Sequence, residues 1–289
     1  MINYLRKRFT LKLRKENNIL KYNILKILSH EALWIYTIPK SGTTYFLFIL
    51  GNLLNSKLEK KDRFDFIDFD TLNKYFSVHS ANHSGRHKNG IDYLINKKQT
   101  IEGKYSFQGV LATHISVPND NWKYCVFLYR NPLDYLISCF HYFHVKRGDR
   151  KYNHPIDIKD IWIPRYIKEY LEFDRIRTEK SNNCLSISYE DLIRNTPKAM
   201  SDAVSLIGLE CSEQEINLAI KNSSKENIRK AEKMNGSTIV AQKSKNYKFS
   251  FIRSGEIGEW KTVFSDRQVD VIFQEFIKNG IDPTKFTYE

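Results

Sequence analysis

The residues best suited to chemistry lie in one short segment, Lys40-Ser41-Gly42-Thr43-Thr44. An apolar run at 33–38 precedes it and a helix is expected at 44–54, so the segment forms a turn between a strand and a helix. Backbone N–H groups at such a helix N-terminus bind anions, glycine allows close approach, and the lysine and hydroxyls add further donors. The segment therefore predicts an anion-binding loop. Its lysine precedes the glycine, unlike the order G-x-x-x-x-G-K-[ST] of nucleotide P-loops.

A second candidate site surrounds Arg130, which follows the apolar run 124–129 and precedes a helix expected to begin at Pro132. Arg130 would lie at the carboxyl end of a strand, where open α/β sheets bind their ligands. Ser138 comes eight residues later, about two helical turns, so both side chains could reach one anion. The guanidinium suits a phosphate because it can donate two parallel bonds. The alternative is a surface arginine beside a helix-capping loop.

Two further segments carry polar groups that fit the same edge of a sheet. Arg253-Ser254-Gly255 is followed by Gly258, and an arginine before two glycines suggests a backbone nest for an anion. His114 ends the apolar run 109–113, and a neutral histidine can accept a proton near pH 7. The alternative for His114 is a structural role, and the glycine loop alone is a weak signal.

The elements that would position these residues alternate along the chain. Strands are expected at 33–38, 109–113, 124–129 and 184–188. Helices are expected at 44–54, 132–146, 160–177, 192–207, 213–221, 225–234 and 266–278. Such alternation is typical of a parallel sheet, so the sequence predicts an α/β fold. The polar segment 55–108 is expected to be an insertion with short helices, and the absence of a repeat or linker favours one domain.

In order and spacing, these segments resemble the cofactor-binding signatures of cytosolic-type sulfotransferases, which use 3′-phosphoadenosine 5′-phosphosulfate (PAPS). Residues 39–44 resemble the family's 5′-phosphosulfate loop, which a tryptophan usually follows; Tyr45 stands there and can still stack on adenine. Arg130 and Ser138 resemble the family's 3′-phosphate site. Residues 253–261 resemble its C-terminal loop, Arg-Lys-Gly-x-x-Gly-Asp-Trp-Lys.

The resemblance implies a three-layer α/β fold, a parallel β-sheet flanked by helices, P-loop NTPase-like and in a single domain. This sulfotransferase domain would span residues 31–289, after a basic N-terminal helical extension at 1–30. Tyr189, within Ser-Tyr-Glu-Asp-Leu, is similar to a family tyrosine that approaches adenine. The residues implied in cofactor binding are Lys40, Ser41, Gly42, Thr43, Thr44, Tyr45, Arg130, Ser138, Tyr189, Arg253, Ser254 and Gly255.

The implied reaction moves a sulfuryl group in line from PAPS to an acceptor hydroxyl or amine and releases PAP. By the resemblance, His114 would take the acceptor's proton and Lys40 would stabilise charge on the bridging oxygen. Ser138 would contact the 3′-phosphate and steer Lys40. The family's reaction needs no metal, and none is expected here. By the resemblance, the acceptor pocket is built from variable segments, here 60–108, 145–158 and 235–250. Because aromatic residues are frequent there, the acceptor is predicted to be a small molecule, a lipid or a glycan.

Three departures from the family pattern have chemical consequences. Ala112 replaces a common lysine two residues before His114, which removes a cation near the transferred group and leaves open a protein that binds PAP or PAPS without turnover. Ser254 replaces a lysine and removes one cofactor contact. The family's dimer motif, Lys-x-x-x-Thr-Val-x-x-x-Glu, is absent around Thr262-Val263, so a monomer and an oligomer both stay open.

Charge is the strongest compositional signal: 46 Lys and Arg against 33 Asp and Glu give the 289-residue chain a net charge of +13. Such a field attracts polyanions. A nucleic-acid-binding role is kept as an alternative, but no recognised motif supports it and no nucleic-acid partner is predicted. The N-terminal extension is either a helix packed on the domain or a peripheral contact with an anionic membrane. A P-loop kinase is disfavoured because the Walker order is missing.

The four cysteines are far apart and form no C-x-x-C pair, and the first 29 residues show no apolar signal-peptide core. A cytoplasmic protein is therefore predicted, with membrane association through the N-terminal extension as the alternative. Two groups of potential ligands are candidate metal sites, but neither shows a fourth ligand. They are Cys139, His141 and His144, and His79, His83 and His87.

Overall fold

The computed structural model describes residues 32–69, 71–72, 76–79, 109–114, 122–145, 151–235 and 253–286. The predicted N-terminal extension at 1–30 and most of the variable segments expected to bind the acceptor lie outside these residues. Among the described helices, none combines the length and the apolar character that a bilayer crossing requires.

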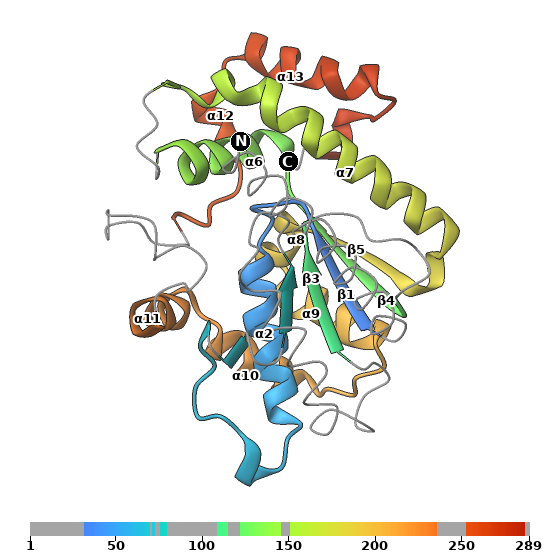
Figure 1. Cartoon of the computed structure of the whole chain (residues 1–289), viewed down its shortest axis with the longest axis vertical. Helices are drawn as coiled ribbons and strands as arrows, with labels where there is room; N and C mark the ends of the chain where they lie inside the picture. The colour runs from blue at the N-terminus through green and yellow to red at the C-terminus, as the bar shows by residue number, and fades with distance from the viewer. Residues whose placement is uncertain are drawn as a thin grey trace, which may run out of the picture.

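A five-stranded sheet in the order β2-β3-β1-β4-β5 forms the centre of the fold (Figure 1). All four neighbouring pairs are parallel, which confirms the predicted α/β class. The strands are β1 Ala32–Thr37, β2 Phe76–His79, β3 Gly109–Thr113, β4 Tyr124–Tyr129 and β5 Cys184–Ser188. The sequence analysis missed β2, because the polar segment around it shows weak periodicity and it pairs only at the sheet edge.

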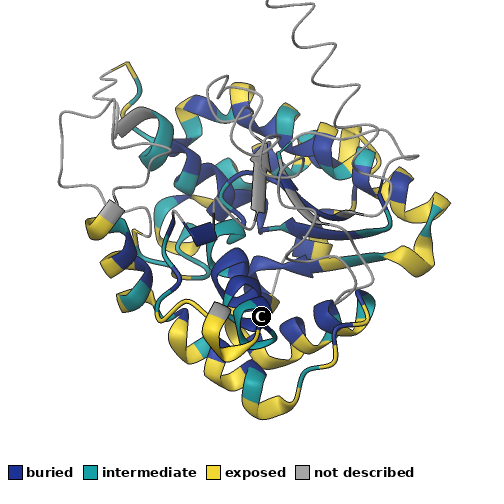
Figure 2. Cartoon of the chain, turned by 60° about the horizontal axis from the view of Figure 1, so that its bottom comes forward, coloured by how far each residue is buried: buried dark blue, intermediate teal, exposed yellow. Residues whose placement is uncertain are grey.

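Two layers of helices cover the sheet, one on each face. Along β1, Leu33 and Ile35 enter one apolar cluster while Trp34 and Tyr36 enter the other, as the two-residue period of a strand requires. The first cluster joins β1 to helices α2 (Thr43–Ser56), α9 (Thr196–Leu206) and α10 (Glu213–Asn222). The second joins it to α6 (Pro132–Cys139), α7 (Lys159–Glu179) and α13 (Asp266–Lys278). Figure 2 shows buried strand residues at the centre of the sheet between the helices, and β1 from Leu33 to Thr37 and β4 from Cys125 to Leu128 are buried.

The helices mostly match the sequence expectations. They are α2 Thr43–Ser56, α6 Pro132–Cys139, α7 Lys159–Glu179, α8 Tyr189–Arg194, α9 Thr196–Leu206, α10 Glu213–Asn222, α11 Lys225–Asn235, α12 Trp260–Val263 and α13 Asp266–Lys278. Short 3₁₀ turns span Lys60–Asp62, Pro155–Ile158, Ser181–Asn183 and Pro283–Phe286.

Two predicted helices are divided in the structure. The helix expected at 192–207 is instead α8 followed by α9, because the Asn195 side chain caps α9 and Pro197 lacks the N–H needed to continue α8. The helix expected at 132–146 ends as α6 at Cys139 and continues as a π-helical segment, Phe140–Val145. Phe143 of this segment stacks on a tryptophan of α7 with ring centroids 4.4 Å apart.

Candidate active site

The carboxyl ends of the parallel strands bring the predicted site residues to one edge of the sheet. β1 ends at Thr37, level with Leu128 near the end of β4, and β4 ends at Tyr129 opposite Ser188 of β5. Residues that follow these strand ends therefore emerge side by side, at the edge where α/β sheets bind ligands. These are the Lys40 loop after β1, His114 after β3, Arg130 after β4 and Tyr189 after β5.

The loop between β1 and α2 has the backbone shape of an anion site. Lys40 has φ 70° and is the one non-glycine residue with positive φ in the described part of the chain, and Gly42 has φ 83° as the N-cap of α2. Positive φ near a helix start turns successive N–H groups toward a common point. The Ile38 N–H donates to Leu128 O at 2.9 Å, which anchors the loop to β4.

Two buried hydroxyl groups in this loop make no hydrogen bond within the described part of the chain. Ser41 is fully buried, and neither its Oγ nor the Oγ1 of Thr43 has a partner among the described residues. Among the residues that the structure describes, no side chain caps the N-terminus of α2, and its first turn contains no acidic residue. Buried polar atoms in proteins are almost always satisfied, so these donors fit an anion lying on the loop.

The Lys40 side chain extends toward the π-helical segment. Its Nζ lies 4.0 Å from the centroid of the Tyr142 ring, a cation–π contact. Tyr142 was not singled out from the sequence, because its place opposite Lys40 depends on the turn from α6 into the π-helix.

His114 is half-buried and oriented by the end of β1. Its Nδ1 lies 2.6 Å from Thr37 Oγ1 and 3.1 Å from Thr37 O. In the tautomer that carries its proton on Nδ1, the ring donates to Thr37 and Nε2 bears the lone pair. This arrangement can present Nε2 as a base.

Arg130 is buried and connects two elements of the site. Its Nη2 donates to Glu256 O at 2.7 Å and lies 3.7 Å from Asp134 Oδ2. The guanidinium carbon sits 4.2 Å from the centroid of the Tyr189 ring. Arg130 Nε is buried with no hydrogen-bond partner in the described part of the chain, so this N–H of the guanidinium is available to a ligand.

Asp134 shapes the loop at 253–259. Its carboxylate accepts from the Gly258 N–H at 2.7 Å and from the Trp260 N–H at 3.0 Å, although it lies more than 120 residues away in the chain. Gly255 and Gly258 have φ 76° and 80°, which a nest requires. Asp134 was missed by sequence reasoning; its position four residues after Arg130 on one helix face was the available signal.

Tyr189 contacts both the loop at 38–44, called the first loop below, and the loop at 253–259, called the second loop. A Cβ on Gly42 would come within 2.9 Å of Tyr189 Cδ2, so the tyrosine ring lies directly against the first loop. The Tyr189 hydroxyl donates to Gly255 O at 2.9 Å in the second loop. Burial, the largest cause, raises the pKa of this phenol and keeps it a donor. Two loops capable of holding anions are thus separated by one aromatic ring and the stacked Arg130.

The remaining predicted residues occupy the borders of this site. Tyr45 is half-buried in the first turn of α2, and Ser138 is half-buried on α6, two turns beyond Arg130. Ser254 Oγ accepts from the Glu256 N–H at 3.4 Å. Arg253 is exposed, and its guanidinium pairs with the Glu259 carboxylate. Gly42 is the N-cap of α2, and Thr44 is the second residue of this helix.

Glu190 fixes the spacing between β4 and β5. It is fully buried, and its Oε1 accepts from the Asn131 N–H at 3.1 Å. Burial raises the pKa of its carboxyl to about 6. The sequence analysis quoted Glu190 only as part of a motif and assigned it no role.

Among the described residues, no three His, Cys, Asp or Glu side chains gather as a metal site would require. His141 lies half-buried near Arg253 instead, and burial, with a smaller contribution from that arginine, lowers its pKa.

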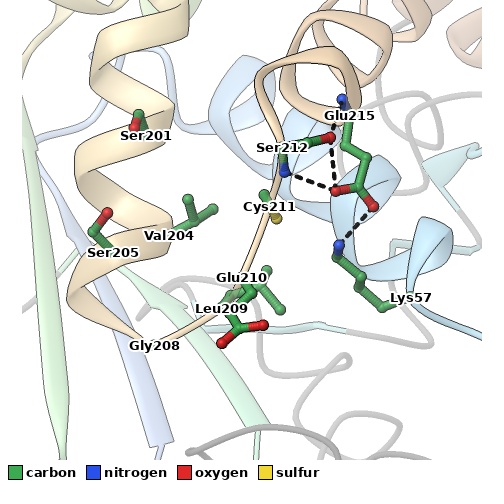
Figure 3. A pocket seen from close by; sticks show the side chains of 10 residues that line it. All are labelled: Lys57, Ser201, Val204, Ser205, Gly208, Leu209, Glu210, Cys211, Ser212 and Glu215. Atoms are coloured by element: carbon green, nitrogen blue, oxygen red, sulfur yellow. Dashed lines mark hydrogen bonds and ion pairs between the residues drawn. The ribbon is translucent and has the colours of Figure 1, made fainter.

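A separate pocket of about 740 Å³ lies at the other end of α2 (Figure 3). Lys57, just after α2, and Glu215 of α10 line it and pair at 2.6 Å. α2 is about 21 Å long, so this pocket is remote from the anion loop at its N-terminus. Ser212 caps α10 within the same wall, and these polar contacts stabilise the junction between α2 and α10.

Comparison with known proteins decides the family. The sequence matches the family model of the sulfotransferase domain over residues 30–284. The chain belongs to the sulfotransferase family. This confirms the resemblance inferred from the separated sequence segments.

Relatives cover most of this sulfotransferase chain. It is 26% identical to the amine sulfotransferase of Oryctolagus cuniculus over 279 residues, which span 90% of the chain and 84% of the relative. It is 25% identical to sulfotransferase 2A6 of Rattus norvegicus, over 91% of the chain and 90% of the relative.

Solved structures share the fold. Retinol dehydratase in a complex with retinol and PAP has a TM-score of 0.62 at 17% identity, covering 89% of this chain and 83% of that one. A mouse sulfotransferase complexed with PAP has a TM-score of 0.60 at 12% identity, covering 92% and 94%. The sulfotransferase fold is therefore shared well beyond the range of close sequence similarity.

Proposed function

We propose that this protein transfers the sulfuryl group of PAPS to a hydroxyl or amine of an acceptor and releases PAP. The observation that carries the proposal is the placement of Tyr189 between two anion-binding loops. PAPS carries a phosphosulfate on its 5′ side and a phosphate on its 3′ side, so it presents two anionic groups on either side of a ribose. The two groups of donors in the site, one in each loop, would face the two anionic groups of the ligand.

The loop at 38–44 would hold the 5′-phosphosulfate. The hydroxyls of Ser41 and Thr43, which have no hydrogen-bond partner among the described residues, and the N–H groups at the start of α2 favour an anion there. Tyr189 and Tyr45 would contact adenine. Arg130, Ser138, Arg253 and Gly255 would hold the 3′-phosphate, with Arg130 already fixed beside the second loop through Glu256 O.

The chemical step follows from the positions of Lys40 and His114. The acceptor oxygen or nitrogen forms a bond to sulfur while the bond from sulfur to the 5′-phosphate oxygen breaks. The acceptor's proton passes to His114 Nε2, since Nδ1 is held against Thr37. Negative charge grows on the phosphate oxygen that leaves, where Lys40 and the loop N–H groups would stabilise it.

The acceptor is proposed to be a small molecule, a lipid or a glycan. The curated relatives support a small-molecule acceptor, since their names include an amine sulfotransferase and a 3-beta-hydroxysteroid sulfotransferase. The retinol dehydratase structures contain retinol or androsterone. The cytoplasmic location and the contact of the N-terminal extension with a membrane stay predictions.

The test is a transfer assay with ³⁵S-labelled PAPS and a panel of hydroxysteroids, phenols, alkyl amines, glycolipids, oligosaccharides and peptides. We expect labelled product from at least one of the small-molecule, lipid or glycan classes. Transfer to peptides alone would overturn the acceptor class. PAP binding without transfer to any acceptor would identify a binding protein, and retention on DNA that PAP does not compete would favour the nucleic-acid alternative.

A further inference from the structure

Helix α11 directs two cations at the second anion loop. Lys225 Nζ donates to Ser254 O at 2.7 Å, and Arg229 Nη2 lies 3.4 Å from Arg253 O, at the edge of hydrogen-bond range. Both side chains are on the helix face that meets the loop, since their positions differ by four residues. The sequence analysis treated this helix only as an element of the fold.

Cations from α11, from the end of β4 and from the loop itself meet at loop residues 253–256. The carbonyls of residues 253, 254 and 256 face Arg229, Lys225 and Arg130 respectively. The carbonyl groups orient these cations without neutralising them. The loop also carries the guanidinium of Arg253.

Three carboxylates, Asp134, Glu256 and Glu259, accompany four cations at the loop, Lys225, Arg229, Arg130 and Arg253. Glu259 pairs with Arg253, and Asp134 lies 3.7 Å from Arg130. In the part of the chain that the structure describes, the recorded polar contacts of Lys225 and Arg229 are to backbone carbonyls. The cations therefore exceed the carboxylates by one, and Lys225 and Arg229 stand beside a glycine nest, a combination that favours an anion.

Residue 254 itself contributes no charge. Its serine hydroxyl accepts from the Glu256 N–H at 3.4 Å, within the loop. We propose that Lys225, with Arg229 one turn behind it, supplies the positive charge for the 3′-phosphate that Ser254 does not. This inference rests on the proposed function and adds a specificity-determining residue to it. Lys225 discriminates PAP from nucleotides that lack the 3′-phosphate.

The experiment compares the Kd of PAP with that of 5′-AMP, which lacks the 3′-phosphate, by calorimetric titration of the full chain. The variant is Lys225→Met, and the matched control is Lys233→Met, which removes an exposed lysine from the same helix. We expect Lys225→Met to weaken PAP about tenfold, the loss of one charge-assisted contact, with 5′-AMP unchanged within twofold. Lys233→Met should leave both constants unchanged.

A rescue variant separates electrostatics from loop structure. Adding Ser254→Lys to Lys225→Met returns a cation to the loop and should restore most of the PAP affinity. An equal loss for PAP and 5′-AMP would show that Lys225 only supports the loop and would overturn the inference, as would an unchanged PAP affinity. If the unmodified chain did not prefer PAP to 5′-AMP, the proposed function itself would fail. If the unmodified chain prefers PAP and the preference is undiminished in Lys225→Met, only the role of Lys225 is refuted.

Discussion

The two anion-binding loops of this protein are positioned in different ways. The loop at 38–44 is enclosed by its own neighbours in sequence, β1 before it and α2 after it, and positive φ at Lys40 and Gly42 sets its shape. The loop at 253–259 connects to short α12 and is held by side chains from distant segments, above all Asp134 and Tyr189. The first loop is built from local backbone geometry, and the second is built from tertiary contacts.

The difference teaches where specificity can change. A backbone nest between a buried strand and a buried helix tolerates few substitutions, because each residue has a fixed φ and little space. A loop oriented by remote side chains can exchange one contact for another, as Ser254 and Lys225 suggest. We therefore expect variants of the first loop to affect all nucleotides, and variants of the second to affect those with a 3′-phosphate.

The largest effect is expected for Lys40→Met in the first loop. Losing a cation that stabilises transition-state charge should lower kcat about 10³-fold, with a smaller loss in PAP affinity. Lys57→Met, which changes a lysine at the far end of the same helix, is the control and should keep kcat within about twofold. Single-turnover transfer of the sulfuryl group is measured for the variant and for the control. A kcat within tenfold of the unmodified chain would remove Lys40 from the chemical step.

His114→Ala should lower kcat by about 10²-fold or more, because the acceptor's proton loses its base. The histidine is held by Thr37 at the end of β1 and is not among the residues proposed to bind the cofactor, so the Kd of PAP should not change. Transfer rate and PAP titration are measured on the same preparation. A matched fall in kcat and PAP affinity would indicate that His114 supports the fold of the site rather than the reaction.

Replacing each of three glycines with alanine separates the cost of backbone strain from the cost of a close contact between the new Cβ and its neighbours. Gly42, Gly258 and Gly280 all have positive φ, which costs a side chain about 1–2 kcal/mol. A Cβ at Gly42 would also meet the Tyr189 ring at 2.9 Å, whereas those at Gly258 and Gly280 meet nothing within 4 Å. Gly42→Ala should therefore weaken both PAP and 5′-AMP about 30-fold.

In urea unfolding, the same Gly42→Ala variant should lose more stability than Gly280→Ala, which measures strain alone. Gly258→Ala should lose stability like Gly280→Ala while weakening PAP selectively. Equal effects of all three substitutions on stability and binding would mean that the contact between Gly42 and Tyr189 does not shape the first loop.

Asp134→Asn tests the tertiary support of the second loop. An amide retains one acceptor oxygen but cannot accept from both the Gly258 and Trp260 N–H groups as the carboxylate does. We expect PAP to weaken about tenfold and 5′-AMP to bind as before, by calorimetric titration. Asp266→Asn, at the exposed start of α13, serves as the control. A similar loss for both nucleotides would show that Asp134 supports the two loops together.

Glu190→Gln should have the smallest effect on binding and a pH-dependent effect on stability. Burial raises the pKa of this carboxyl from 4.5 to about 6, so the folded state holds the proton more tightly than the unfolded chain. Wild-type stability from this group is full below pH 4.5 and is lost as pH rises through about 6. Over this interval the free energy of unfolding of the amide variant should rise relative to that of wild type, by up to about 2 kcal/mol at pH 7.

The measurement for Glu190 is urea unfolding of both proteins at pH 4, 5, 6 and 7. Subtracting one unfolding free energy from the other at each pH removes the contribution of the titrating groups that both proteins share. A difference that stays constant over this range would show that the carboxyl titrates normally in the folded protein.

The sequence predicted the first loop and the strands around it because their signals are local. An apolar run before Lys40 and another after Thr44 define β1 and α2, and the alternation of strands and helices indicates the parallel sheet. Asp134, Tyr142 and Lys225 were missed because each acts across a long sequence separation, on a loop or side chain that only the fold brings near. β2 was missed for a related reason, since an edge strand in a polar segment carries little periodicity.

The most direct test of the two-loop site is a calorimetric titration of the unmodified chain with PAP and with 5′-AMP. If one nucleotide spans both loops, PAP should bind with micromolar or tighter affinity, and removing the 3′-phosphate should cost at least about tenfold. Equal affinities for the two nucleotides would contradict a site in which the loop at 253–259 holds the 3′-phosphate, and no binding of either would contradict the assignment of PAPS as the donor.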